Sequence, residues 1–180
     1  MNHDSYPDSY IRGILNTVKS IAMVGFSPNT SRPSYFVFKY FLERGTRVIP
    51  VNPGHAGKEV LGQKVYGKLA DIPEPIDMVD IFRASEFVPG VVQEALALTP
   101  LPQVIWMQLE IRNDEAAAMA EAAGIKVVMN RCPKIEYGRL SSEISWMGIN
   151  SRTLSSKRGQ ILPGGVQRMG LGNAGDKKND

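Results

Sequence analysis

Five short apolar stretches, separated by segments of helical periodicity, constrain the fold of this 180-residue chain more than any other feature. The stretches begin at residues 20, 47, 76, 103 and 125 and read "SIAMVG", "RVIPVNP", "IDMVDIF", "QVIWMQ" and "IKVVMN". Continuous apolar runs of this length are typical of strands that are buried on both faces of a parallel sheet. Their alternation with helices predicts an α/β fold: a single domain with a Rossmann-like, doubly wound, parallel sheet of five strands.

The segments between the strands carry helix signals. Helices are expected over residues 10–18, 33–44, 86–98 and 112–124. Pro33 suits a first helical turn, Asn113 can cap the last of these helices, and Gly45 and Gly124 are placed to end theirs. The apolar stripe of the second helix is expected to be Phe36, Val37, Tyr40 and Phe41. The loop after the second strand, residues 54–67, is expected to lack a full helix.

The charge of the chain is concentrated at its end. Residues 151–180 hold six basic and two acidic residues, which gives this segment a charge of +4. The whole chain has a formal net charge of +3, so residues 1–150 carry about −1. We expect residues 1–150 to form the domain and the basic, Gly- and Ser-rich residues 151–180 to form a disordered tail. The weak charge of the body argues against nucleic-acid binding there. Nucleic-acid binding through the tail stays an alternative, and removal of the chain from about Ser151 would abolish it.

Composition also excludes several classes of protein. The single cysteine, Cys132, excludes an internal disulfide and a zinc site made of cysteines. The first residues are polar and acidic where a signal peptide would be apolar, and no apolar run is long enough to span a bilayer. We therefore expect a cytoplasmic protein without a membrane partner.

Ligands of open parallel sheets bind beyond the carboxyl ends of the strands. The residues that follow each strand are therefore the candidate site. They are Gly25, Phe26, Ser27, Pro28, Asn29, Thr30, Ser31, Arg32, Pro33, Ser34, Asn52, Pro53, Lys58, Phe82, Arg83, Gln108, Asn130, Arg131 and Cys132. The loop after the first strand has hydroxyl groups beside a helix N-terminus, whose amides attract anions, so it is predicted to bind phosphate.

The loop departs from the NAD-binding pattern. Ser27 and Thr30 replace the second and third glycines of that motif, and the second strand ends in Asn52 and Pro53 rather than in an acid that would bind ribose hydroxyls. Three basic residues, Arg32, Lys58 and Arg83, could instead converge on a phosphate group additional to the diphosphate. A nucleotide with a diphosphate and an additional phosphate therefore fits better than plain NAD.

Five blocks of the chain together resemble a known family. In order they are "GFSPNTSRPSY", "VIPVNP", "DMVDIFR", "VIWMQLEI" and "VVMNRCPKIEY", within residues 10–140. They are similar to the small bacterial CoA-binding proteins, whose Rossmann-like domain is similar to the CoA-binding domain of succinyl-CoA synthetase α subunits. This resemblance implies a site for coenzyme A or a short acyl-CoA.

The resemblance also implies roles for individual residues. The loop from Gly25 to Ser34 would wrap the CoA phosphates, Asn52 and Pro53 would line the nucleotide, and Lys58 would lie near the phosphates. Phe82 and Arg83 would flank the adenosine or the phosphates, and residues from Trp106 to Gln108 would lie toward the pantetheine arm. The synthetase's phosphorylated histidine lies in a second domain, and neither His3, expected in a floppy lead, nor His55, in a loop, would replace it. The family usually has glycine where this chain has Glu110, which makes that side of the pocket more acidic.

Catalytic residues are less clearly indicated. A half-buried, inert thiol is the favoured interpretation of Cys132, and the alternative is a redox or mixed-disulfide role for a thiolate that Arg131 and Lys134 would favour. Asp80 lies within an apolar strand and is expected to be hydrogen-bonded in a structural role. No nucleophile with an oriented base and no metal cluster is found. The sequence thus favours a non-catalytic carrier, sensor or regulatory protein for CoA, with an NAD(P)-linked oxidoreductase or a transferase or ligase component completed by a partner chain as alternatives. A homodimer is expected by analogy with domains of this size.

Overall fold

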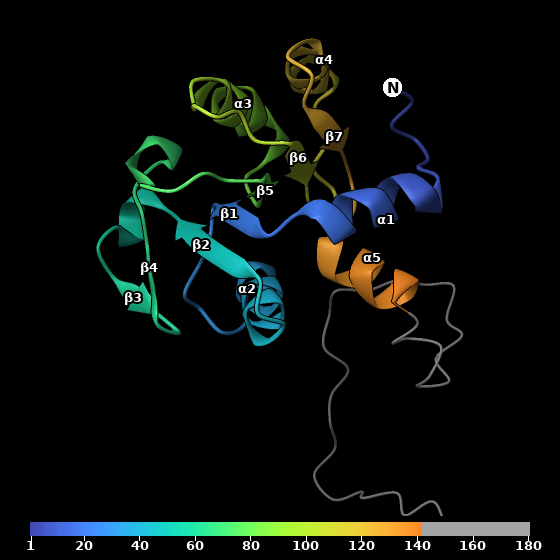
Figure 1. Cartoon of the computed structure of the whole chain (residues 1–180). Coiled ribbons are helices and arrows are strands. Elements are labelled where there is room, and N and C mark those ends of the chain that lie inside the picture. Colours follow the sequence, from blue (N-terminus) through green and yellow to red (C-terminus); the bar gives the residue numbers. More distant parts are fainter. Residues whose placement is uncertain (142–180) are drawn as a thin grey trace, which may run out of the picture.

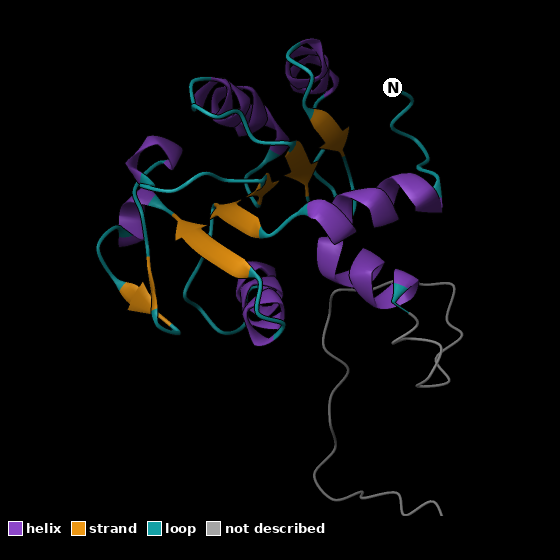
Figure 2. Cartoon of the chain, viewed as in Figure 1, coloured by secondary structure: helices purple, strands orange, loops and turns teal. Residues whose placement is uncertain are grey.

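The computed structural model describes residues 1–141, and within them five parallel strands form one sheet with helices on both faces (Figures 1 and 2). The strands in spatial order are β2 (Arg47–Val51), β1 (Ser20–Val24), β5 (Met78–Ile81), β6 (Val104–Met107) and β7 (Lys126–Val128). The sheet is therefore the predicted Rossmann-like one. The order of the strands reverses between β1 and β5, and a reversal of this kind opens a crevice for a ligand at the carboxyl ends of the two strands.

Two apolar layers hold the helices against the sheet. The helices are α1 (Asp8–Thr17), α2 (Pro33–Glu43), α3 (Val88–Leu96), α4 (Asp114–Ala122) and α5 (Pro133–Leu140). Along β1, Ala22 and Val24 face the layer under α3 and α4, whereas Ile21 and Met23 face the layer under α1, α2 and α5. Figure 1 shows the two groups of helices on opposite sides of the strands. This alternation along β1 lets one strand contribute to both cores.

Local sequence signals set the ends of the helices. Pro33 occupies the first turn of α2, and the Asn113 side chain accepts a hydrogen bond from the Ala116 amide at 2.8 Å to cap α4. Gly45 and Gly124 follow α2 and α4 with φ of 75° and 81°, in the left-handed region that ends helices. These expectations from the sequence are confirmed.

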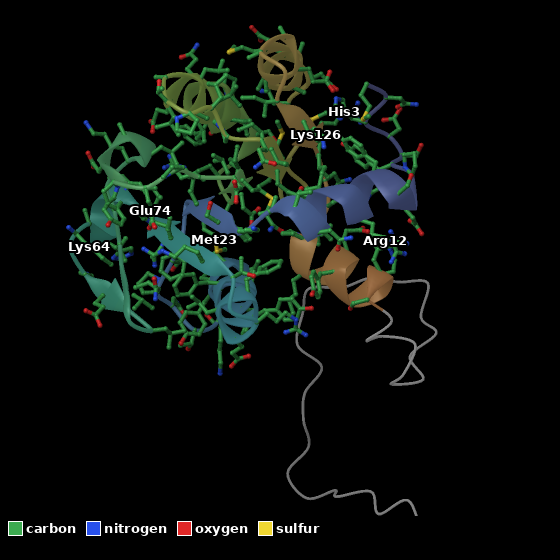
Figure 3. The ribbon with its side chains drawn as sticks, in the orientation of Figure 1. His3, Arg12, Met23, Lys64, Glu74 and Lys126 are labelled. Carbon is green, nitrogen blue, oxygen red and sulfur yellow. The ribbon has the colours of Figure 1, made fainter. Side chains whose placement is uncertain are left out.

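Neighbouring segments shield both outer strands. On β2, Tyr66 forms a parallel bridge with Val51, and its amide donates to the Pro50 carbonyl at 2.9 Å. On β7, the Tyr6 hydroxyl accepts from the Met129 amide at 2.7 Å, and the Tyr10 hydroxyl donates to the Val127 carbonyl at 3.3 Å. In Figure 3, Lys64, two residues before Tyr66, lies on the β2 side of the sheet, and His3 and Lys126 lie on the opposite, β7 side.

Three features differ from the sequence-based expectations or were missed by them. His3 is buried rather than part of a floppy lead, because its ring bonds the Tyr6 hydroxyl at 2.9 Å and lies 3.4 Å from a Glu121 carboxylate oxygen. Helix α5 follows β7, where no helix was predicted. The loop after β2 lacks a full helix, as expected, but holds a short antiparallel pair, β3 (Glu59–Val60) with β4 (Gln63–Lys64). The predicted tail, residues 151–180, lies outside the described residues.

Candidate functional site

The loop between β1 and α2 lies against the end of β5. Gly25 has φ of 86°, and a Cβ atom on it would lie 3.0 Å from the Phe82 carbonyl oxygen and 3.0 Å from Arg83 Cδ. Its amide donates to the Val51 carbonyl at 3.0 Å. Only glycine combines this conformation with such a close approach. The structure therefore brings Gly25 together with Phe82 and Arg83, at the point where the strand order reverses.

The hydroxyl groups of this loop already bond one another, and their remaining donors differ. Ser34 Oγ accepts from the Ser27 amide at 3.1 Å, and Ser27 Oγ accepts from the Asn29 amide at 3.3 Å. Ser31 Oγ instead donates to Asn29 Oδ1 at 2.7 Å. A serine hydroxyl has one proton to donate. Ser27 and Ser34 therefore donate no proton within the loop, whereas Ser31 has used its own; Ser27 is half-buried and Ser34 is 4% exposed.

The same loop leads into a helix end that no side chain caps. Arg32 is the N-cap residue of α2 and makes no side-chain capping bond, and Pro33 follows it. The positive end of the helix dipole thus faces the loop without a built-in carboxylate. Thr30 and Pro28 belong to the same loop, with Thr30 exposed and Pro28 half-buried. The arrangement suits an anion at this edge of the sheet.

Asn52 ties the next strand end to this loop. Its side-chain Nδ2 donates to the Phe26 carbonyl at 2.7 Å, and its Oδ1 accepts from the Gly54 amide at 2.9 Å. Pro53 then begins a short 3-10 turn, Pro53–His55. Because one side chain bonds both loops, the ends of β1 and β2 are held in a fixed relation. Phe26 itself is fully buried in the core, so its side chain anchors the loop.

The three predicted cations face different neighbours. Lys58 is exposed, and its Nζ lies 3.4 Å from His55 Nδ1. The Arg83 guanidinium lies 4.7 Å from the centre of the Phe87 ring, and that ring is 48% exposed. Arg32 is exposed at the start of α2. Their convergence on one phosphate stays a prediction.

A buried carboxyl lies at the end of the central strand. Asp80 is 0% exposed, and both of its oxygens accept from Gln108 Nε2 at 3.0 Å. Burial is the larger influence on this group and raises the pKa of Asp80 to about 8, against the opposing effect of the Gln108 hydrogen bond. Asp80 is therefore mostly protonated at neutral pH. Its expected hydrogen-bonded setting is confirmed, and its partner is a residue of the predicted site.

A pocket of about 380 Å³ lies at the ends of β6 and β7, between α1 and α5. Its apolar wall consists of Ile11, Leu109, Cys132 and Ile135, and its polar wall includes Tyr6, Asp8, Asn130, Arg131, Glu136 and Arg139. The pocket contains three residues predicted for the site, from Asn130 to Cys132. The others come from α1, α5, the segment before α1 and, for Leu109, the chain just after β6, and no motif in the sequence signals their meeting.

The charges of this pocket pair with one another. Arg139 Nη2 lies 2.7 Å from Asp8 Oδ1 and 2.7 Å from Glu136 Oε2, and Arg131 Nε lies 3.8 Å from Glu136 Oε1. Glu136 is 4% exposed, so its carboxylate depends on these two arginines. Two positive and two negative groups thus compensate each other in the polar wall of the pocket.

Cys132 is not the thiolate that its basic neighbours suggest. Its side chain is 3% exposed, and burial, the dominant influence, raises the pKa of the thiol to about 11. The nearby Asp80 contributes in the same direction, while backbone hydrogen bonds and Lys134 oppose it. Of the two interpretations of this residue, the structure supports the inert thiol, because desolvation outweighs the attraction of Lys134. Cys132 is a neutral wall of the pocket.

Trp106 is core rather than exposed surface. It is fully buried, and its Nε1 donates to the Arg131 carbonyl at 2.7 Å, which fixes the chain just before Cys132. Asn130 and Glu110 have φ of 52° and 66°, and the Asn130 side chain accepts from the Glu110 amide at 2.8 Å. The ends of β6 and β7 are joined in this way. Gln108 stays buried beneath them.

Other classes of site can be addressed for residues 1–141. No group of three or more His, Cys, Asp or Glu side chains in this part of the chain is arranged to hold a metal ion. Among the helices of the same residues, none is long and apolar enough to cross a membrane.

Comparisons with known proteins agree with this architecture. The chain is 41% identical over 127 residues to the uncharacterized protein YneT of Bacillus subtilis, and the match covers 71% of this chain and 91% of YneT. It is 34% identical over 80 residues to the alpha subunit of the ADP-forming acetate-CoA ligase I of Pyrococcus furiosus, but these cover 42% of this chain and only 17% of that subunit.

Solved structures show the same fold. A hypothetical protein from Pyrococcus horikoshii has a TM-score of 0.72 at 40% identity, covering 78% of this chain and 96% of that one. A Thermus thermophilus protein, cell-free ID.343, has a TM-score of 0.71 at 38% identity, covering 75% and 99%. The sequence model of the CoA binding domain matches residues 19–138, which include β1 to β7 and most of α5. The resemblance seen in the five sequence blocks is thus confirmed, and the chain belongs to the CoA-binding domain family.

Proposed function

We propose that the protein binds coenzyme A or a short acyl-CoA at the carboxyl ends of β1, β2 and β5, and that it acts as a carrier, sensor or regulatory protein. Membership of the CoA-binding domain family supports the class of ligand. The observation that carries the proposal is the β1–α2 loop, with Gly25 packed against the end of β5 and an uncapped helix N-terminus beside it.

The loop offers two kinds of donor to a phosphate. The hydroxyl proton of the half-buried Ser27 remains for a ligand, since its oxygen acts as an acceptor within the loop. The amides of the first turn of α2 add the partial positive charge of a helix end. The Ser27 side chain also occupies the position where NAD-binding loops need glycine for close approach of the pyrophosphate. A helix end can bind the diphosphate of either ligand, so it is the departure from the glycine pattern at Ser27 that argues against plain NAD.

The first experiment is isothermal titration of the full chain with CoA, acetyl-CoA, NAD and NADP. We expect CoA to bind at micromolar concentration and NAD to give no heat. Lys58→Ala should weaken CoA binding, because Lys58 would lie beside the phosphates. Binding of NAD or NADP without CoA would overturn the proposal and point to an oxidoreductase.

A matched pair of variants tests the loop itself. Ser27→Ala removes a proton donor that the loop leaves for the ligand, and we expect about a tenfold loss of CoA affinity, the order of one hydrogen bond to a charged group. Ser31→Ala removes a hydroxyl whose proton is already used by Asn29, so a change of less than about threefold is expected. Equal losses in the two variants would contradict this assignment of the phosphate donors.

A further inference from the structure

We propose that the pocket between α1, α5 and the ends of β6 and β7 is an acyl subsite, which receives an uncharged short aliphatic acyl group at the thiol end of CoA. This inference rests on the proposed function, since it requires CoA at the neighbouring strand ends. It adds a selectivity: short aliphatic acyl-CoA over free CoA, and over acyl groups that end in a carboxylate.

The position of the pocket fits the far end of a ligand anchored at the β1–α2 loop. Strand β7 lies two places beyond β5 in the sheet, which is a separation of roughly 10 Å. Leu109 comes from the end of β6, between the two. The pocket thus lies at the same carboxyl edge of the sheet as the site proposed for the nucleotide, two strands away from β5.

The size and the lining of the pocket fit a small apolar group. Its volume of about 380 Å³ lies within the range of small-molecule sites, and such sites combine an apolar wall with a few polar groups. The apolar wall is formed by Ile11, Leu109, Cys132 and Ile135. This volume has room for the thiol end of pantetheine together with an acyl chain of a few carbons.

The charges in the polar wall of the pocket select against a carboxylate on the acyl group. Arg139 already binds Asp8 and Glu136 at 2.7 Å, and Arg131 also faces Glu136. An entering carboxylate would have to separate Glu136, which is 4% exposed, from its arginine, and a buried charge without its partner is costly. An uncharged acyl group leaves these pairs intact.

The chemistry of Cys132 is consistent with binding without acyl transfer. A nucleophilic thiol would have to ionise, whereas burial raises the pKa of Cys132 to about 11 and keeps the group neutral. A thioester could therefore lie against this side chain without exchanging its acyl group. The subsite holds the acyl group and leaves the thioester bond in place.

The test is titration of the full chain with CoA, acetyl-, propionyl-, butyryl- and succinyl-CoA. We expect one of the aliphatic thioesters to bind about tenfold more tightly than CoA, the order that one or two buried carbons supply. Succinyl-CoA should bind no more tightly than CoA. The same series is then measured on two variants at one position, Ile135→Phe and Ile135→Ala.

The two variants act in opposite directions. Ile135→Phe fills the pocket and should abolish the gain from the acyl group, while Ile135→Ala enlarges it and should move the preferred chain to a longer one. Leu15→Phe is the matched control, since Leu15 lines a separate pocket of about 100 Å³ between α1 and α5. It should leave the order of the acyl chains unchanged, and CoA binding by each variant verifies that it is folded.

The possible failures are distinguishable. If CoA binds but the acyl chains add nothing, or if both Ile135 variants keep the original preference, the acyl subsite is refuted while the proposed function stands. Tighter binding of succinyl-CoA than of CoA would refute the selectivity for uncharged acyl groups. If none of the CoA compounds binds the native chain, the proposed function fails and the subsite with it.

Discussion

Glu110 holds a backbone conformation that few residues other than glycine adopt. Its φ is 66°, and it is exposed, so its side chain gains little packing in exchange for the strain. Glu110→Gly should raise the free energy of unfolding by about 1 kcal/mol, measured by urea denaturation. Removal of the negative charge should also strengthen CoA binding.

Glu110→Gln separates these two effects. It removes the charge but keeps the Cβ atom, so we expect stronger CoA binding without added stability. If Glu110→Gly were no more stable than Glu110→Gln, the strain at this position would be too small to matter.

Asp80 should make stability fall with pH. The folded protein keeps this carboxyl protonated up to about pH 8, whereas the unfolded chain ionises it near pH 4. Between these values the folded state binds more protons than the unfolded state, so the free energy of unfolding decreases as pH rises, by up to about 1.4 kcal/mol per pH unit. The decrease should level off above pH 8.

Asp80→Asn removes this titration and keeps an oxygen that accepts from Gln108. The difference in stability between Asp80→Asn and the native protein should therefore change steadily from pH 4 to pH 8, in favour of the variant at the higher pH. Urea denaturation at four or five pH values measures it. A difference that stays constant over this range would show that Asp80 is ionised in the folded protein.

At the scale of elements, the covering of β7 depends on single hydroxyl groups. Tyr6→Phe removes the acceptor of the amide of the buried Met129 and should cost about 2 kcal/mol of stability, with faster hydrogen exchange at that amide. Tyr10→Phe removes a longer bond, at 3.3 Å, and should cost about 1 kcal/mol or less. If neither substitution lowered stability or sped up exchange, ring packing rather than the hydroxyls would cover the strand.

The elements that periodicity predicts are those whose burial follows a regular pattern. The five strands and the helices α2, α3 and α4 have continuous or amphipathic apolar residues, and all were predicted. Within α2, the fully buried aromatic residue is Phe38 rather than the predicted Phe36, because tertiary contacts choose which side of a largely apolar helix faces the sheet. Helix α5 was missed because the positions it buries include Glu136 and Gly138, which give no apolar pattern.

The candidate site likewise has a part that the sequence predicts and a part that it does not. The β1–α2 loop and Asn52 could be selected from the sequence, since their positions after strands follow from the fold. The pocket beside Cys132 could not, because it depends on pairs such as Arg139 with Asp8, which are 131 residues apart. The neutral state of Cys132 also depends on burial, which nearby charges in the sequence do not reveal.

For the whole molecule, the basic segment and the CoA site should be separable. The family match ends at residue 138, and the helix that closes the described fold ends at Leu140. A chain that ends at residue 150 should therefore bind CoA within about twofold of the full chain and lose any salt-dependent affinity for nucleic acid. Titration with CoA and with duplex DNA measures both. Loss of CoA binding on truncation would place residues 151–180 in the site.

The shielding of both outer strands bears on how copies of this protein could associate. Tyr66 on β2 and the two tyrosine hydroxyls on β7 occupy backbone groups through which a strand from another copy would otherwise be added. Self-association through a continuous intermolecular sheet is disfavoured on either side. The expected homodimer would therefore be built from side chains on helices and loops, so its strength could evolve by surface substitutions while the strand ladder stays intact.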